Sequence, residues 1–204
     1  MATTTDFVAS ANTAIYGQNT TYTTARSTST GENSSTTFQL GQTVGGGITY
    51  EVFRDFLNFD TSSIPDNMVV TDVKLRMVVT SGLYNSNFEI QIIEQVFNLS
   101  SYVRETIYDD CLAASSYYLW RNTSSGITND TQYTGASMTN GYVNKSGITS
   151  YSIRSSRDKS GSPPTISLQY EYCNIYSRTI ATTSYRPTLI VTYDLPSSLP
   201  VIWI

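Results

Sequence analysis

The chain has 204 residues, of which 14% are charged, and its formal net charge is −4; soluble domains usually carry roughly 25% charged residues. Its twelve Lys and Arg residues are scattered along the sequence, which argues against nucleic acid as a partner. No apolar run approaches the roughly 20 residues that cross a bilayer, so no membrane insertion is expected. The sequence contains no histidine, which excludes His-based nucleophilic triads and His-based zinc sites.

The first part of the chain predicts short strands separated by polar turns. Residues 4–9 and 12–16 are expected to form a first strand. Residues 17–35 are dominated by Thr, Ser, Asn and Gly, which favour loops. Within that stretch, residues 21–26 could pair as an edge strand, and no helix is predicted there.

Residues 51–81 form the stretch around which the rest of the fold is expected to be organised. They predict two strands joined by a turn at Pro65, with apolar and polar residues alternating in each strand. The predicted core-facing residues are Phe53, Leu57 and Phe59 in the first strand and Val73, Leu75, Met77 and Val79 in the second. Arg54 and Asn58 are expected to face water, where Arg54 would pair with an acid on the same sheet face, such as Glu171.

The second half of the chain predicts one helix among further strands. Residues 87–97 alternate as a third strand, whereas apolar residues recur at helical spacing between residues 100 and 115. Residues 121–139 are expected to be a long polar loop, and loops of that length are usually functional or docked on another surface. Three more strands follow, and residues 195–204 form an apolar tail.

These elements predict an all-β fold. Nine to eleven short strands, each with one apolar face, need a second sheet to cover that face. We therefore expect a single antiparallel β-sandwich (jelly roll) over residues 1–194, with at most one short helix near residues 100–115. The tail, residues 195–204, is expected to pack on its own domain or on a neighbouring subunit. The candidate subunit-contact residues are Val201, Ile202, Trp203 and Ile204.

The two cysteines, Cys111 and Cys173, are expected to be buried free thiols. They lie too far apart in the sequence for a metal-ligand spacing. A disulfide between them is the less favoured alternative, because a chain that assembles in a cytoplasm keeps its thiols reduced.

Three stretches of the chain follow the pattern of one known family. Residues 53–77 carry a pattern like Arg-x-Leu-x-Phe-Asp-x-Ser-x-Ile-Pro, residues 141–165 an Arg-Ser-Ser-x-Asp turn, and residues 171–194 an Arg-Pro-x-Leu-x-Val-x-Tyr ending. In these places the chain resembles the DNRLRE domain, a jelly-roll β-sandwich related to carbohydrate-binding modules. The resemblance implies that sandwich fold, and many members are appended or structural domains in surface proteins and phages. Neither an attached enzyme nor a secretion signal is visible here, which favours a stand-alone structural domain.

A glycan site needs exposed aromatic faces beside polar side chains. The best cluster consists of Tyr117, Tyr118 and Trp120 next to Asn122. The alternative is that these rings are buried under the neighbouring loop or in a subunit contact.

A structural calcium ion is the one cofactor for which the sequence offers a site. Calcium takes six to eight oxygen ligands, and Asp6 and Asp194 could meet where the two ends of the chain converge. No DxDxDG loop supports it, and no other cofactor is expected.

A glycosidase needs two convergent carboxylates. Candidate acids are Asp55, Glu89, Asp109, Asp110 and Glu171. Solvated acids on strands and loops explain these residues better.

The sequence favours a non-enzymatic structural protein on the surface of a virus or phage particle, as capsid decoration or as part of a fibre. Its partners would be other virion proteins or copies of itself, with weak adsorption to cell-surface glycans. The first alternative is a carbohydrate-binding module that is secreted or held at a cell surface. The second and less favoured alternative is a glycoside hydrolase or lyase.

Overall fold

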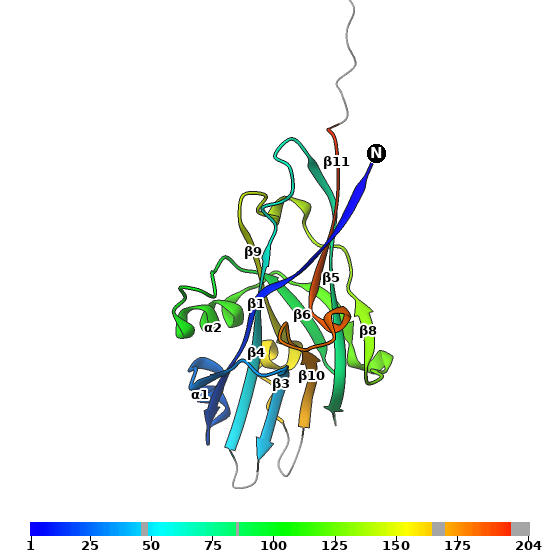
Figure 1. Ribbon diagram of the computed structural model, residues 1–204. Coiled ribbons are helices and arrows are strands. Elements are labelled where there is room, and N and C mark those ends of the chain that lie inside the picture. The colour runs from blue at the N-terminus through cyan, green and yellow to red at the C-terminus, as the bar shows by residue number, and fades with distance from the viewer. Residues whose placement is uncertain (46–48, 85, 165–169, 197–204) are drawn as a thin grey trace, which may run out of the picture.

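The protein is described by a computed structural model over residues 1–45, 49–84, 86–164 and 170–196, and most of these residues lie in antiparallel strands (Figure 1). The strands are β1 (Thr3–Asn19), β2 (Gly31–Asn33), β3 (Thr37–Gly45), β4 (Thr49–Asp60), β5 (Val69–Tyr84), β6 (Glu89–Glu94), β7 (Tyr118–Asn122), β8 (Thr131–Thr134), β9 (Ile148–Ser155), β10 (Tyr170–Tyr176) and β11 (Thr188–Asp194). The α-helices are α1 (Tyr22–Ser27), α2 (Arg104–Ala113) and α3 (Ser156–Ser160), and the 3-10 turns are η1 (Thr123–Ser125), η2 (Asn140–Tyr142) and η3 (Thr183–Tyr185).

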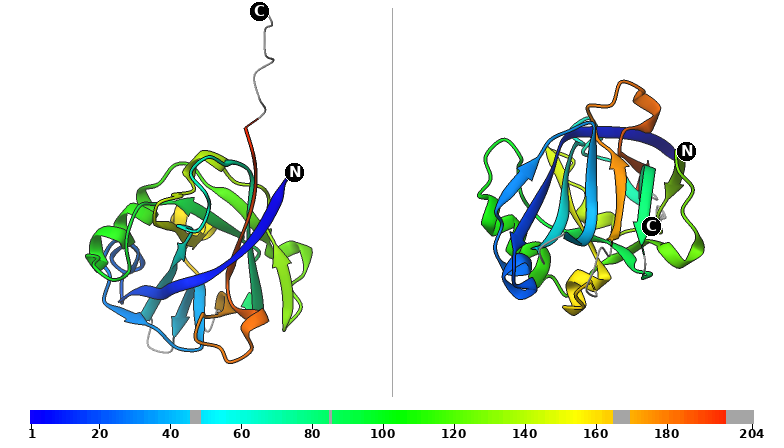
Figure 2. Two further views of the ribbon diagram at one scale, coloured as in Figure 1. Left: turned by 45° about the horizontal axis from the view of Figure 1, so that its top comes forward. Right: turned by 90° about the horizontal axis from the view of Figure 1, so that it is seen from below.

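The strands are hydrogen-bonded in the order β2-β1-β11-β5-β10-β3-β4-β9-β6-β7, and β8 pairs with β5. The long first strand pairs with two strands that lie far apart in this order, because residues Thr3–Val8 of β1 pair with β11 and the residues from Ala9 onward pair with β4. The register shifts by one bulge between Ala9 and Ala11. The result is the predicted all-β sandwich, whose two layers share β1 (Figure 2).

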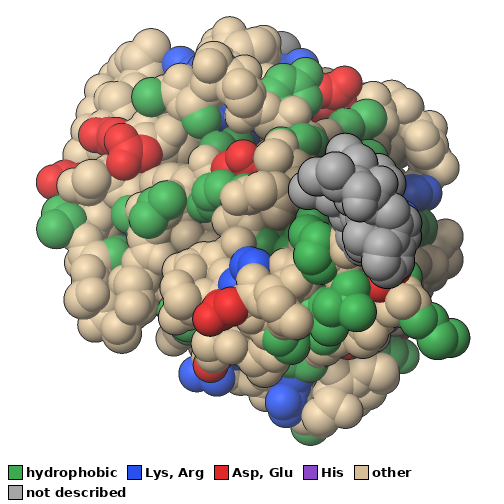
Figure 3. Space-filling model, turned by 90° about the horizontal axis from the view of Figure 1, so that it is seen from above, with side chains coloured by type: hydrophobic (Ala, Val, Ile, Leu, Met, Phe, Trp, Pro, Cys, Tyr) green, Lys and Arg blue, Asp and Glu red, His purple; other side chains and the backbone are tan. Residues whose placement is uncertain are grey.

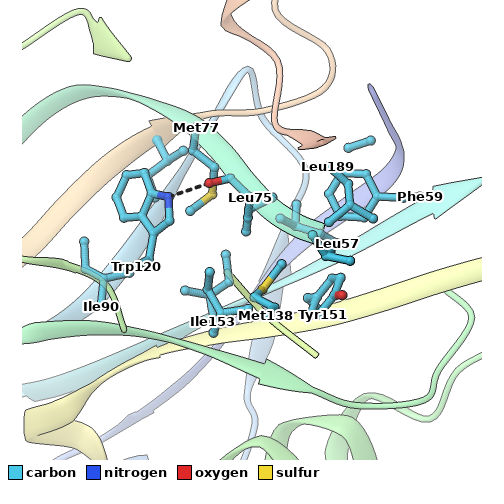
Figure 4. Close-up of a cluster of buried hydrophobic side chains, with 14 of the residues drawn as sticks. Leu57, Phe59, Leu75, Met77, Ile90, Trp120, Met138, Tyr151, Ile153 and Leu189 are labelled. Atoms are coloured by element: carbon cyan, nitrogen blue, oxygen red, sulfur yellow. Dashed lines mark hydrogen bonds between the residues drawn. The ribbon is translucent and has the colours of Figure 1, made fainter. Parts of the chain in front are cut away.

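The space between the layers is filled by apolar side chains (Figure 4). The predicted core-facing residues are confirmed, except that Phe53 is half-buried and packs against Tyr16. Trp120, Met138 and Leu189 join this core from segments far apart in the sequence. The alternation of β5 therefore identified one wall of the core correctly.

Gly41 occupies a position in β3 that no other residue fits. Its φ is +123°, and a Cβ atom built there would lie 2.2 Å from the backbone oxygen of Glu171. Gly41 is also the first residue of β3 that pairs with β4, opposite Phe53. A glycine at this point lets β3 lie close to β10 while it begins its ladder with β4.

The predicted helix between residues 100 and 115 is confirmed as α2. At most one helix was predicted, but the described residues also contain two further short helices, α1 and α3. The predicted edge strand at residues 21–26 is wrong: α1 (Tyr22–Ser27) forms there, and its Tyr22 and Ala25 pack on Val52 of β4. The third helix, α3, begins where the Ser155 side chain accepts a hydrogen bond from the backbone of Asp158. Short polar helices of this kind carry little signal in hydrophobic periodicity.

The predicted long loop at residues 121–139 is docked along β5. Its strand β8 pairs with Arg76–Val79, and the backbone N–H of Met138 donates to the carbonyl of Val73 at 2.8 Å. Thr and Tyr, which favour strands, account for three of the four residues of β8 (Thr131, Tyr133 and Thr134).

Two other predictions concern the two cysteines and membrane-spanning helices. Cys111 and Cys173 are both buried and unpaired, as predicted. Among the residues that the structure describes, no helix is long and apolar enough to cross a membrane.

Candidate functional site

One end of the sandwich presents apolar side chains to solvent. Here β1 begins, β11 ends and β5 starts, since Asp194 pairs with Val69 and Tyr193 with Thr3. Val69 is 48% exposed and Leu195 is 57% exposed. Figure 3 views the molecule from this side and shows hydrophobic side chains gathered over it. We call this surface the apolar end and define it by Met68, Val69, Val70, Val143, Leu195 and Pro196.

The apolar end contains two adjacent hollows, each of about 380 Å³, that share Val69 as a wall. The first lies between the start of β5 and η2, and the second lies between the start of β5 and the end of β11. An exposed apolar surface with concave features is typical of a site that binds another macromolecule.

Hydrogen bonds hold the backbone around these hollows in place. The Nζ of Lys145 donates to the carbonyl oxygens of Asp66 and Met68 at 2.6 and 2.9 Å. The Nδ2 of Asn140 donates to the carbonyl oxygen of Thr71 at 2.9 Å. A surface held in this way loses little conformational entropy when a partner covers it.

The predicted subunit-contact residues fall outside the described part of the chain. They are Val201, Ile202, Trp203 and Ile204. The last described residues, Leu195 and Pro196, line the second hollow.

The predicted calcium ligands are not brought together. Asp6 pairs with Arg76 at 2.7 Å, whereas Asp194 pairs with the amino terminus of Met1 at 2.9 Å. The β1–β11 register places Asp6 opposite Ile190, roughly 13 Å along the ladder from the position of Asp194. The hydrogen bond from the amino terminus lowers the pKa of Asp194. Across the described ranges, no three His, Cys, Asp or Glu side chains gather as metal ligands would.

The predicted glycan cluster does not form one exposed surface. Trp120 is only 4% exposed, and its Nε1 donates to the carbonyl oxygen of Leu75 at 3.0 Å inside the core (Figure 4). Tyr117 is exposed and lies just before β7 begins at Tyr118. Tyr118 is half-buried and donates to Glu94, and Asn122 caps η1. The sequence could not reveal this division, because the ring of Trp120 is covered by segments outside β7, among them β5 and Tyr133 of β8.

A buried polar cluster lies under the three helices, on the face of β4 that the sequence placed in water. Arg54 and Asn58 are 0% and 2% exposed, which corrects that expectation. The Nε and Nη2 of Arg54 donate to the two carboxylate oxygens of Asp158 at 2.7 and 2.9 Å. Its Nη1 donates to the carbonyl oxygen of Tyr108 in α2 at 2.7 Å. The partner of Arg54 is thus Asp158, whereas the predicted partner Glu171 pairs with Arg157 at 2.6 Å.

Cations also bind the carboxyl end of α2. Arg154, which is fully buried, donates to the carbonyl oxygens of Cys111, Leu112 and Ala114. Lys159 of α3 donates to the carbonyl oxygens of Leu112 and Ala113 at 3.0 and 3.2 Å. Helix carboxyl ends attract positive charge, and these bonds fix α2 to β9 and α3. The donors of Arg54, Arg154 and Lys159 are directed at backbone carbonyl oxygens and at the Asp158 carboxylate, which favours a structural role for this cluster.

The candidate catalytic acids lie on different elements. Asp55 points into the core and Glu171 is buried beside Arg157, whereas Asp109 and Asp110 are exposed on α2. Glu89 is half-buried on β6. Burial raises the pKa of Asp55 well above its ordinary value, but its environment is the apolar core.

Comparison with known proteins found no matching family model and no matching curated protein. The resemblance to the DNRLRE domain therefore stays a prediction from the sequence.

Proposed function

We propose that this protein is a non-enzymatic structural protein that acts through contacts between subunits, and that the apolar end is its contact surface. The observation that carries the proposal is the pair of hollows around Val69, which lie at the point where the described chain ends at Pro196. The sequence beyond that point is mostly apolar and contains Val201, Ile202 and Trp203.

The length of the tail allows a contact between neighbouring copies. Residues 197–204 are eight in number, and eight residues span at most about 26–29 Å when extended. We propose that the apolar tail of one copy covers the apolar end of another.

The energetics favour covering this surface. Full burial of a Val or Leu side chain contributes about 1.5–3 kcal/mol. Val69 and Leu195 are each about half exposed, so a partner that covered both would recover about 1 kcal/mol at each side chain. The fixed backbone around the hollows adds to this by keeping the entropy cost low.

The setting that we propose is the surface of a virus or phage particle, as capsid decoration or part of a fibre. The β-sandwich fold and the resemblance of the sequence to a domain found in phage proteins support this setting. A surface with few charges and many hydroxyls is compatible with it, since Ser and Thr supply 58 of the 204 residues.

The carbohydrate-binding alternative would need residues other than those predicted. Trp120 is in the core, and Tyr117 alone offers an exposed ring in that region. For a glycosidase, the dispersal of the acids over β4, β6, α2 and β10 gives no support.

The test is the oligomeric state of the full-length chain, measured by light scattering over a range of concentrations. We expect the native chain to self-associate, and both Val69→Asp and Trp203→Asp to shift it toward the monomer. Val96→Asp is the matched control, because Val96 is also exposed but lies outside both hollows. A native chain that is monomeric at every concentration, or an equal effect of Val96→Asp, would contradict the proposal.

A further inference from the structure

A separate hollow of about 260 Å³ lies away from the apolar end, where four segments of the chain meet. It is formed by the bulged part of β1, by β2 and the residue after it, by the segment before α2, and by the turn after β10. The residues that matter for binding are Asn12, Glu32, Ser34, Leu99, Tyr102 and Arg178. We call it the Arg178 hollow.

The backbone of the Arg178 hollow is fixed by hydrogen bonds. The Oδ1 of Asn12 accepts from the backbone N–H of Arg178 at 3.1 Å. The backbone N–H of Ser177 donates to the carbonyl oxygen of Thr36 at 2.9 Å, and the backbone N–H of Leu99 donates to the Oδ1 of Asn58 at 2.7 Å. The walls are therefore set before any ligand arrives.

One wall carries a carboxylate and a phenol. The hydroxyl of Tyr102 donates to the Oε2 of Glu32. Burial and the neighbouring Glu32 raise the pKa of Tyr102 to about 12, so the phenol keeps its proton at neutral pH. Among the described residues, no hydrogen bond occupies the second oxygen of the Glu32 carboxylate, so this oxygen can accept one from a ligand.

The opposite charge is supplied by Arg178. Only its backbone N–H is engaged; within the described ranges, its guanidinium has no hydrogen-bond or ion-pair partner. A guanidinium presents a planar fork of donors that matches a carboxylate in a bidentate geometry. The hollow thus offers a free anion-binding group beside several hydroxyl-binding groups.

We propose that the Arg178 hollow binds one acidic sugar unit, that is, a monosaccharide that carries a carboxylate. Arg178 binds the carboxylate, while Glu32, Asn12 and Ser34 bind ring hydroxyls. Leu99 and the ring of Tyr102 supply the apolar contact for the C–H face of the sugar. The volume is slightly below that of pockets for drug-sized ligands, which suits a single unit. This inference does not depend on the proposed subunit contacts.

The test is a titration of the full-length protein with glucuronic acid, followed by NMR chemical-shift changes or calorimetry. Glucose supplies the hydroxyls without the carboxylate, and acetate supplies the carboxylate without the hydroxyls. We expect saturable binding of glucuronic acid in the millimolar range and clearly weaker binding of both partial ligands. If acetate bound as tightly as glucuronic acid, the hollow would be a site for anions alone. If glucose bound as tightly, Arg178 would not contribute to binding. Either result would overturn the proposal.

Two variants connect the binding to this hollow. Arg178→Gln removes an unpartnered guanidinium and leaves the backbone bond to Asn12, so the fold should persist. It is expected to weaken glucuronic acid binding roughly 10- to 100-fold. Lys74→Gln is the control, because it removes one positive charge from β5 outside the hollow. An equal effect of the two variants, or no binding by the native protein, would contradict the proposal.

Discussion

Arg54 and Asp55 are neighbours on β4, both fully buried, and they lie on opposite faces of the strand. Arg54 lies under the helices, where Asp158 and two backbone carbonyls accept from its guanidinium. Asp55 faces the sandwich core beside Leu57 and Phe59, and neither of its carboxylate oxygens has a hydrogen-bond partner among the described residues. The comparison shows that burial alone does not decide the energetic role of a charged residue. The groups that surround it decide whether it stabilises or destabilises the fold.

The largest effect is expected from removing Arg54, which lies on the face of β4 where the buried charges are hydrogen-bonded. Arg54→Ala would leave Asp158 buried without its main cation and two carbonyl groups without their donor. Removing one partner of a buried ion pair typically costs about 3–5 kcal/mol, so we expect the free energy of unfolding to fall by about that amount. Urea unfolding followed by circular dichroism measures it. Arg178→Ala is the control, with an expected change within about 0.5 kcal/mol; a similar loss in both variants would refute the structural role of Arg54.

A smaller effect, an increase in stability, is expected from replacing Asp55, whose carboxylate has no hydrogen-bond partner among the described residues. Asp55→Asn keeps the shape of the side chain and removes its titration. A buried polar group without a partner costs about 1–3 kcal/mol, but this cost remains in the variant, so the difference between the two proteins comes from the titration. The raised pKa means that folded Asp55 retains its proton where the unfolded chain has lost it. The loss of stability caused by this raised pKa is therefore absent below the unfolded pKa of about 3.9, and it grows as the pH rises above that value. We expect Asp55→Asn to unfold at a higher temperature than the native protein at pH 7 and at a similar temperature near pH 3.

Asp60→Asn is the matched control for this pH dependence. Asp60 is exposed, and hydrogen bonds from Ser62 lower its pKa. Its contribution to stability is thus present above the unfolded pKa and lost as the pH falls, which is the opposite trend. If Asp55→Asn followed the same trend as Asp60→Asn, the assignment of Asp55 as a buried neutral acid would be wrong.

The smallest effect is expected at the edge of the polar cluster. Lys159→Met removes the cation that contacts the last carbonyl groups of α2. Charges at helix ends contribute about 0.3–1 kcal/mol, so stability should fall by that amount. Hydrogen exchange should report faster exchange in α2 and unchanged exchange in β5. Unchanged exchange in α2 would mean that Arg154 alone holds this helix end.

The same strand shows what could be predicted from the sequence. The alternation of Leu57 and Phe59 identified the core face, because a period of two is a local property of a strand. The burial of Arg54 and Asn58 could not be predicted, because the segments that cover them lie elsewhere in the sequence. Helices contact Arg54, and residues 97–99 contact Asn58. Two adjacent charged residues in the middle of the strand, Arg54 and Asp55, were the available signal, because alternation places one of them on each face. The Arg-Ser-Ser-x-Asp turn contained Asp158, the partner of Arg54.

The candidate sites were harder to predict than the fold. The aromatic spacing around Trp120 suggested an exposed surface, but the ring is buried in the core and its Nε1 donates to the carbonyl oxygen of Leu75 in β5. The Arg178 hollow combines β1, β2 and two later segments, and no sequence pattern marks that combination. Sites built from single residues of distant segments become visible only after the strands have been paired.

The pairing of β1 with β11 has a consequence for the order in which the protein folds during synthesis. Thr3 and Tyr193 are partners in one ladder, so β1 must wait after its synthesis until β11 has also been made. Contacts between residues so distant in sequence make folding slow. Until β11 arrives, Phe7 of β1 lacks its partner Leu189, and the unpaired strand is open to mispairing. The time needed to synthesise the chain from β1 to β11 therefore sets a lower limit on the time in which this sandwich can close.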